Sequence, residues 1–199
     1  MWRLPLVYLV LVGGASAGIV STREPGPEEV RAVIRATAFT SALPFLLLFT
    51  ASSLHRLWPS ATTRWLMANR RYLGLSVAAS HFWHLLAIIA FVQLYLSEPL
   101  ETVTLVFGGA GFVFLGLMAA TSTDAAQRAL GRWWDRLHKT GVYVVWLDFI
   151  FTYMGPVIHF FTPEGPEAVS WLSPFHVIMT LSFALAWTLR LVAFAGVRR

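Results

Sequence analysis

The sequence predicts an all-α integral membrane protein, organised as one domain over residues 1–199 with a bundle of six transmembrane helices. Three observations support this fold class. Apolar residues make up 57% of the chain and charged residues only 13%, which is typical of membrane proteins rather than soluble domains. The apolar residues form six runs long enough to cross a bilayer. The basic residues gather in alternate connections between these runs, as expected of a polytopic protein.

The first three spans are expected at about residues 4–22, 30–54 and 72–96. The first span follows Arg3, and its small residues at 15–17 leave two interpretations open, a retained helix or a cleaved signal peptide. The second follows a loop rich in Pro, Gly and Glu, in which Pro27 suits the first turn of a helix. The third follows Arg70 and Arg71 and ends at a break that contains Pro99.

The last three spans are expected at about residues 102–120, 137–154 and 170–197. The fourth span is rich in glycine, which lets neighbouring helices approach closely. Between the fourth and fifth spans, helix-capping hydroxyls precede basic residues and paired tryptophans. This pattern predicts an amphipathic helix on the membrane surface at about residues 124–136. A loop with Pro163 and Pro166 precedes the last span.

Basic residues favour one side of this layout. They are Arg3, Arg56, Arg64, Arg70, Arg71, Arg128, Arg132, Arg136, Lys139, Arg198 and Arg199. The positive-inside rule therefore predicts that both termini are cytoplasmic, with the bacterial inner membrane as the expected location. The net charge of +5 is spread over short segments that can contact lipid headgroups, and this argues against a nucleic-acid partner. Arg190, near the end of the last span, is expected to reach the lipid interface as an anchor.

Six histidines and no cysteine limit the redox chemistry that the chain can support. Without cysteine, disulfides, thiolate metal sites and covalently attached c-type haem are excluded. Counted by helical rise, His138 lies level with Arg70 at the cytoplasmic boundary, whereas His81, His84 and His176 lie further out. Imidazoles on neighbouring helices can hold haem iron from both sides. The two tiers therefore suggest a membrane electron carrier, with packing histidines as the simpler alternative.

Asp148 is expected near the middle of the membrane, where an ionised carboxylate is costly unless it is paired or hydrated. Two functional roles are open. The carboxylate could accept a hydrogen bond from an imidazole and raise its basicity as a ligand, or it could relay protons beside a quinone or a haem. The alternative is a protonated carboxyl that bonds to a neighbouring helix.

Two blocks of the sequence carry a family resemblance. The first is RRYLGL at residues 70–75, followed by His84, and the second joins TST at residues 121–123 to residues 127–138. Together they resemble the ferric reductase-like transmembrane domain family. The resemblance is greatest to its MsrQ branch, the haem-binding membrane subunits of the bacterial methionine sulfoxide reductase system. It implies a six-helix bundle that holds b-type haem between its third and fifth helices and passes electrons across the membrane.

The resemblance also implies axial ligands to haem iron. His84 corresponds to the outer-haem ligand of the third helix, and His138 corresponds to the inner-haem ligand of the fifth helix. The third-helix position of the inner site falls on Arg70, as it does in the MsrQ branch. These matches make His84 and His138 the candidate iron ligands.

One position departs from the family pattern. The second histidine of the family's fifth helix corresponds to Phe151, which cannot ligate iron. Three explanations are open. His176 could replace it as the partner of His84 or His81; the outer site could be five-coordinate or empty, which leaves one haem; or a divergent subgroup could use the bundle differently.

The implied cofactor is haem b, with one or two copies, and a flavin or quinone is a further candidate. Because no flavin or nicotinamide domain is recognisable, the chain is expected to be an electron-transfer subunit rather than a self-contained enzyme. It would exchange electrons with a separate redox protein, a flavin or a quinol. The alternative from another class is a haem-free or single-haem membrane protein with a structural or transport role on the same bundle.

Overall fold

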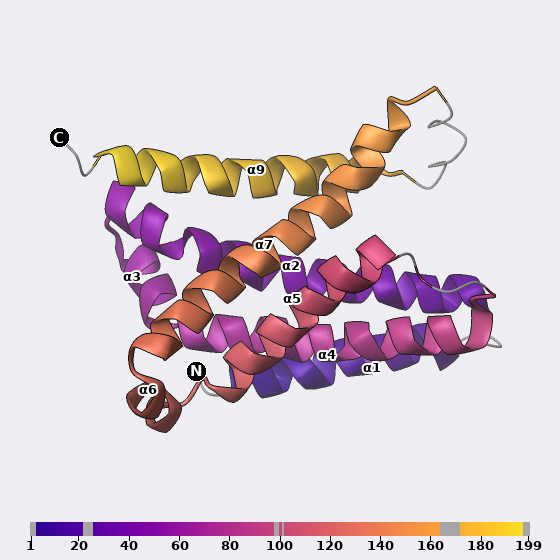
Figure 1. Cartoon of the computed structure of the whole chain (residues 1–199), viewed down its shortest axis with the longest axis horizontal. Coiled ribbons are helices and arrows are strands. Elements are labelled where there is room, and N and C mark those ends of the chain that lie inside the picture. Colours follow the sequence, from indigo (N-terminus) through magenta and orange to yellow (C-terminus); the bar gives the residue numbers. More distant parts are fainter. Residues whose placement is uncertain (1–2, 22–25, 98–99, 101, 164–171, 197–199) are drawn as a thin grey trace.

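The computed structural model describes residues 3–21, 26–97, 100, 102–163 and 172–196, and over these ranges it contains helices and no strand (Figure 1). The helices are α1 (Leu4–Ser21), α2 (Pro27–Leu57), α3 (Ala61–Ala68), α4 (Arg70–Tyr95), α5 (Thr102–Ala120), α6 (Asp124–Leu130), α7 (Arg132–Phe160) and α9 (Pro174–Ala195). The prediction of an all-helical chain is confirmed.

Five helices, α1, α2, α4, α7 and α9, are by themselves long and apolar enough to cross a membrane. Residues 104–120 of α5 meet the same test together with α6, to which they are bent by 106°. Large apolar side chains cover the outside of the molecule; Val10, Leu94 and Leu181 are each more than 60% exposed. An apolar surface of this extent suits contact with lipid. The structure therefore supports a membrane protein with five or six spanning helices.

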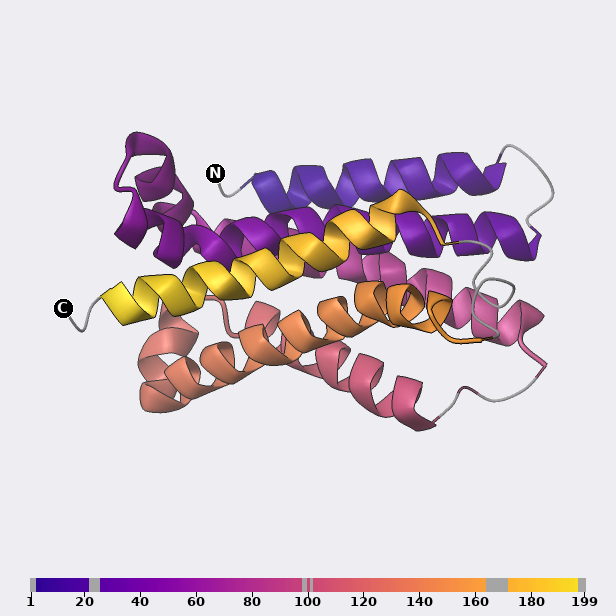
Figure 2. The ribbon, with the colours of Figure 1, turned by 90° about the horizontal axis from the view of Figure 1, so that it is seen from above.

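The two ends of the bundle differ in charge. Both described ends of the chain lie at the same end of the molecule, beside α3 and α6 (Figures 1 and 2). We call it the basic end, because the described basic residues that the sequence assigned to one side lie there, in the short helices α3 and α6 or near the ends of longer helices. They are Arg3, Arg56, Arg64, Arg70, Arg71, Arg128, Arg132, Arg136 and Lys139. Arg198 and Arg199 lie outside the described residues.

The boundaries of the helices differ from the expectations at two places. The predicted surface helix at residues 124–136 is divided at Gly131, whose φ of 49° lies in the left-handed region that favours glycine. Helix α6 therefore ends at Leu130, and the paired tryptophans belong to the first turn of α7. The sequence analysis also missed α3, whose first turn is capped by the Ser60 hydroxyl accepting from the backbone N–H of Thr63.

Smaller differences concern the ends of the spans. Helices α2 and α7 extend beyond residues 30–54 and 137–154 at both ends, whereas α9 begins at Pro174 rather than residue 170. Residues 22, 170, 171 and 197, at the edges of the predicted spans, lie outside the described residues. Such shifts of a few residues are common at helix termini.

Side-chain hydrogen bonds join helix α1 to both α2 and α4. Pro44 has no N–H, so the carbonyl of Thr40 lacks its usual partner within α2. The hydroxyl of Tyr8 in α1 donates to that carbonyl at 2.5 Å. Trp83 of α4 donates from Nε1 to the carbonyl of Leu9 in α1 at 2.8 Å. These hydrogen bonds hold α1 against α2 and α4.

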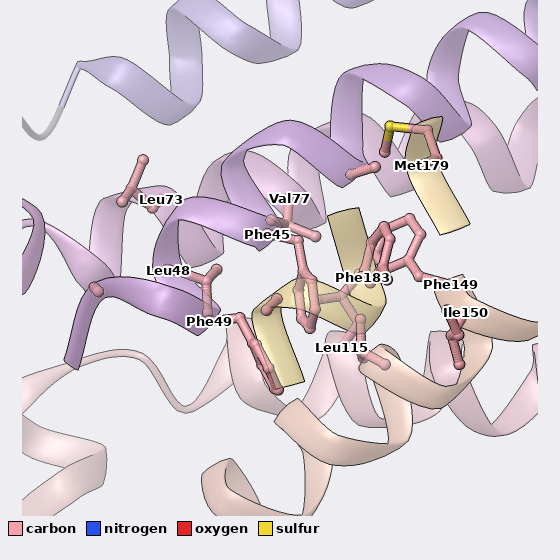
Figure 3. Packing of buried hydrophobic residues seen from close by; sticks show 14 of the residues in the cluster. Phe45, Leu48, Phe49, Leu73, Val77, Leu115, Phe149, Ile150, Met179 and Phe183 are labelled. Carbon is pink, nitrogen blue, oxygen red and sulfur yellow. The ribbon is translucent and has the colours of Figure 1, made fainter. Parts of the chain in front are cut away.

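An aromatic core lies where α2, α7 and α9 meet (Figure 3). The ring centroids of Phe45 and Phe149 are 5.2 Å apart, and those of Phe149 and Phe183 are also 5.2 Å apart. Phe45 is 2% exposed and Phe183 is fully buried. Aromatic pairs at these distances add about 0.5–1.5 kcal/mol each beyond the area that they bury. This core holds the three helices together and closes the inner side of the cavity described below.

A basic cavity at one end of the bundle

A cavity of about 480 Å³ lies at the basic end, among side chains of α2, α4, α5, α7 and α9. Its volume is within the range of roughly 300–1,000 Å³ that is usual for ligand pockets. Phe45, Val77 and Leu115 form part of its apolar wall. These residues also belong to the buried core (Figure 3), so packed apolar side chains line one side of the cavity.

Positive charge dominates the polar part of the lining. Arg70, Arg71, Lys139 and Arg190 line the cavity, and no acidic side chain is among the described residues around it. Arg71 forms an ion pair with Asp124, whereas neither Arg70 nor Lys139 pairs with an acidic group in the described part of the chain. Uncompensated cations in a partly apolar cavity favour anionic ligands.

Arg190 is held inward by two hydrogen bonds. Its guanidinium donates to the carbonyl of Phe49 at 2.8 Å and to the hydroxyl of Tyr143 at 3.2 Å. The guanidinium carbon also lies 4.4 Å from the centroid of the Phe49 ring. The expectation of a lipid-facing anchor is therefore wrong. No local sequence signal reveals this role, because the partners lie on helices that are distant in the sequence.

The imidazole of His138 is oriented by Trp134 one turn earlier in α7. Its Nδ1 lies 3.1 Å from the Trp134 carbonyl, and the two rings stack with centroids 3.9 Å apart. A carbonyl can only accept, so the proton is assigned to Nδ1 and the lone pair to Nε2. This Nε2 is buried and has no hydrogen-bond partner among the described residues. His138 lines the cavity in the tautomer that suits a metal ligand.

The start of α7 is fixed against the end of α5. Trp134 donates from Nε1 to the carbonyl of Thr121 at 2.9 Å, which joins two parts of the second motif block. Three residues before Thr121, the thioether of Met118 rests on Gly141 of α7: a Cβ added at Gly141 would lie 2.7 Å from Sδ. Met118 is 8% exposed and lines the same cavity as His138.

His81 and His84 lie together on α4, as predicted, but aromatic rings surround them. Their ring centroids are 5.5 Å apart. The Nδ1 of His84 lies 3.1 Å from the carbonyl of Ile34 in α2. The ring of His81 contacts Phe112 of α5 at 5.5 Å and Phe149 of α7 at 5.4 Å. Two phenylalanine rings from neighbouring helices therefore pack directly against the imidazole of His81.

His176 participates in the start of α9. Its Nδ1 accepts a hydrogen bond from the backbone N–H of Ser173 at 3.3 Å. A series of ring contacts runs from His81 through Phe149 and Tyr153 to His176, with centroid distances of 5.4, 6.5 and 6.3 Å. Two aromatic rings therefore separate the imidazoles of His81 and His176. This arrangement does not favour His176 as the partner that replaces the missing histidine.

Asp148 and Phe151 face α5 rather than the cavity. A Cβ added at Gly111 would lie 2.8 Å from the Oδ2 of Asp148, so the carboxylate lies directly over that glycine. No imidazole among the described residues bonds to this carboxylate, so the structure shows no partner for the first of the two roles left open for Asp148, whereas the proton relay stays a prediction. The ring of Phe151 is half-exposed and contacts Phe107 at 6.0 Å.

The described residues contain no group of three or more His, Asp or Glu side chains that could hold a bare metal ion. Haem differs from such ions because the porphyrin supplies four ligands and the protein needs to supply only one or two. No family model, curated protein or solved structure matches this chain. The residues of the cavity are therefore the basis for assigning a function to this chain.

Proposed function

We propose that this chain is a b-type haem-binding integral membrane subunit that relays electrons across the bilayer to a separate redox protein. It would be a divergent member of the ferric reductase-like family, closest to the MsrQ branch. The observation that carries the proposal is the buried Nε2 of His138, which has no partner in the described structure and lines a cavity rich in cations.

The lining residues fit a haem chemically. His138 would bind the iron through Nε2, because the hydrogen bond from Nδ1 to the Trp134 carbonyl holds the imidazole in position. Arg70, Lys139 and Arg190 supply positive charge for two propionates. The apolar wall suits the porphyrin ring and excludes water from it. When bound, the haem supplies one-electron redox chemistry, whereas the protein controls its orientation, its axial ligation and its access to water.

The surroundings of the outer histidines, His81, His84 and His176, support one haem rather than two. A second haem beside His84 would need a histidine from α7, where the family position is Phe151. The residue of α7 that faces His81 is Phe149, which is 4% exposed and packed in the aromatic core. Of the three explanations for Phe151, we therefore favour the loss of the outer haem.

The proposed topology has six spans, both termini in the cytoplasm, and the bacterial inner membrane as the location. The concentration of Arg and Lys at the basic end supports this orientation. The basic cavity would then be near the cytoplasmic surface, within reach of a soluble redox protein or a flavin. A quinol could exchange electrons from the lipid side. Electron transfer would make the chain a subunit of an oxidoreductase.

A second candidate is a haem-free membrane protein with a structural or transport role. The same observation of cations beside an apolar wall also favours other anionic amphiphiles, such as a phospholipid. Such a ligand would use Arg70 and Arg190 but would not need the Nε2 of His138. The two candidates therefore differ in their dependence on His138.

The test is to purify the protein in detergent after expression with a haem precursor and to record the reduced-minus-oxidised spectrum. We expect about one haem per chain by pyridine haemochrome, and its loss in His138→Ala. His55→Ala is the matched control, because His55 also lies at the basic end but does not line the cavity. Its Nδ1 lies 3.0 Å from the hydroxyl of Thr63. Absence of a Soret band from the wild-type protein would exclude the electron carrier.

The same assay locates the haem. We expect His81→Ala, His84→Ala and His176→Ala to retain it, because none of the three lines the basic cavity. Loss of haem in His84→Ala, with retention in His138→Ala, would instead place the haem beside the outer histidines His81 and His84.

A further inference from the structure

Arg71 differs from the other cations around the basic cavity because it has an acidic partner. Its side chain lines the cavity, and its guanidinium forms an ion pair with the carboxylate of Asp124, the first residue of α6. In the described part of the chain, no carboxylate pairs with Arg70, Lys139 or Arg190. The protein therefore neutralises one cation of the lining and leaves the other three for a ligand.

Asp124 holds Arg71 from outside the cavity. Ser122 lines the cavity, whereas Asp124, two residues later, does not. The hydroxyl of Thr123 accepts a hydrogen bond from the backbone N–H of Ala126 at 3.1 Å, and this cap fixes Asp124 in the first turn of α6. The ion pair therefore lies at the rim of the cavity, where it joins the start of α4 to the start of α6.

The ion pair at the rim is accessible to water and to a competing anion. The side chains of Arg71 and Asp124 are 36% and 68% exposed. Such exposed pairs contribute little to stability, because water solvates both charges when the pair opens. None of the described side chains of α6 is buried, and the bond from Trp134 to the Thr121 carbonyl joins α5 to α7 without α6. Opening of the pair therefore leaves the walls of the cavity in place.

From this arrangement we propose that Asp124 competes with the acidic group of a cavity ligand for Arg71. Without a ligand, the guanidinium pairs with Asp124. When a carboxylate or phosphate enters the cavity, it replaces Asp124 as the partner of Arg71, and the Asp124 carboxylate is released to water. Because every anionic ligand must displace this internal anion, Asp124 lowers the affinity of the cavity for such ligands.

The competition depends on the acidic group and not on the rest of the ligand. A guanidinium binds carboxylates and phosphates alike through paired N–H donors. For the propionates of haem, the inference rests on the proposed function and specifies how that site is regulated. For the phosphate of an anionic phospholipid, the same exchange at Arg71 applies. The experiment therefore uses one probe of each kind.

The test is to titrate the full-length apoprotein in a neutral detergent at low salt with haem and, separately, with phosphatidylglycerol. Asp124→Asn should raise the affinity roughly two- to fivefold, the range expected for the loss of an exposed ion pair. Arg71→Met should lower it roughly tenfold, because the ligand loses a hydrogen bond to a charged group. Haem dimethyl ester and diacylglycerol lack the acidic group, so neither substitution should change their affinities. Absorbance measures the binding of haem, and calorimetry measures the binding of lipid.

A double variant separates competition for Arg71 from a general effect of charge. If Asp124 acts through Arg71, Asp124→Asn should have no effect in a protein that already carries Arg71→Met. If Asp124 only repels the ligand through space, the substitution would raise the affinity in both backgrounds, and this result would overturn the inference. Glu28→Gln is the matched control, because Glu28 pairs with Arg31 in the first turns of α2, at the opposite end of the bundle. It should bind both probes as the wild type does.

The outcomes also separate this inference from the proposed function. An unchanged affinity of Asp124→Asn for haem that the wild type binds would overturn the competition and leave the proposed function intact. A wild type that binds phosphatidylglycerol but not haem would overturn the proposed function, and the lipid affinities of the variants would then decide the competition. A wild type that binds neither probe would overturn both.

Discussion

At the scale of residues, the cavity depends on Arg190, a partly buried cation that is held between helices. A charged side chain within an apolar span is costly unless its donors are bonded. Arg190 reduces this cost through the Phe49 carbonyl, the Tyr143 hydroxyl and the face of the Phe49 ring. The guanidinium still lines the cavity, where no acidic group among the described residues neutralises it. We therefore expect Arg190 to contribute to ligand binding rather than to anchoring.

Arg190→Met should retain the fold but lower the affinity for haem. Hydrogen bonds to charged groups contribute about 1.5–3 kcal/mol, so the loss of one to a propionate should reduce the affinity roughly tenfold to a hundredfold. Haem titration of the apoprotein measures the affinity, and thermal unfolding in detergent tests the fold. Arg56→Met is the control, because Arg56 donates to the Ala193 carbonyl at 3.2 Å and lies outside the cavity. Equal affinities in the two variants would contradict the role of Arg190.

At the scale of elements, the basic end is assembled by short contacts between helix termini. Thr123 caps α6, and its neighbour Asp124 pairs with Arg71 at the start of α4. The hydrogen bond from Arg71, together with its positive charge, lowers the pKa of the Asp124 carboxyl below its ordinary value of 3.8. The pair is largely exposed, so its contribution is small and decreases with salt.

The contribution of the Arg71–Asp124 ion pair to the stability of the fold is expected to decrease at low pH. Because the pKa of Asp124 is lower in the folded protein, the pair stabilises the fold above pH 3.8, and this contribution is lost as the pH falls through the folded-state value. Asp124→Asn should therefore lower the melting temperature slightly at pH 7 and have no effect in strong acid. Thermal melts of both proteins at low salt measure the difference. A difference that persists unchanged at the lowest pH would contradict the ion pair.

At the scale of the whole molecule, the asymmetry between the two ends predicts the orientation in the membrane. The chain contains no cysteine, so a single introduced cysteine can be labelled without background. Ala125 is exposed on α6 at the basic end, and Thr162 is exposed beyond α7 at the opposite end. These two positions lie on opposite sides of the proposed membrane.

We expect a membrane-impermeant maleimide to label Thr162→Cys in cells whose inner membrane is intact. Ala125→Cys should be labelled only after the membrane is permeabilised, because the positive-inside rule places the basic end in the cytoplasm. Haem content measured on the same samples shows that both variants are folded. Labelling of Ala125→Cys alone in intact cells would reverse the proposed orientation.

Local patterns in the sequence were sufficient to predict the helical class, the approximate spans and the candidate ligand His138. Hydrophobic runs, caps and breaks are properties of neighbouring residues, and so they can be read from the chain. The sequence also indicated that Phe151 departs from the family pattern. It did not indicate Gly131 as the end of the surface helix, because a glycine in the left-handed region differs from a helical glycine only in its backbone conformation.

The tertiary structure decided which residues meet at the basic end. The inward position of Arg190 depends on partners in α2 and α7, and the contact of Met118 with Gly141 depends on the register between α5 and α7. The separation of His81 from His176 likewise depends on rings from α7 that pack between them. Such contacts join residues that are far apart in the sequence, and no local periodicity encodes them. The sequence by itself therefore determined a membrane helix bundle with a ligand-capable histidine, whereas the packing of five helices determined the basic cavity around it.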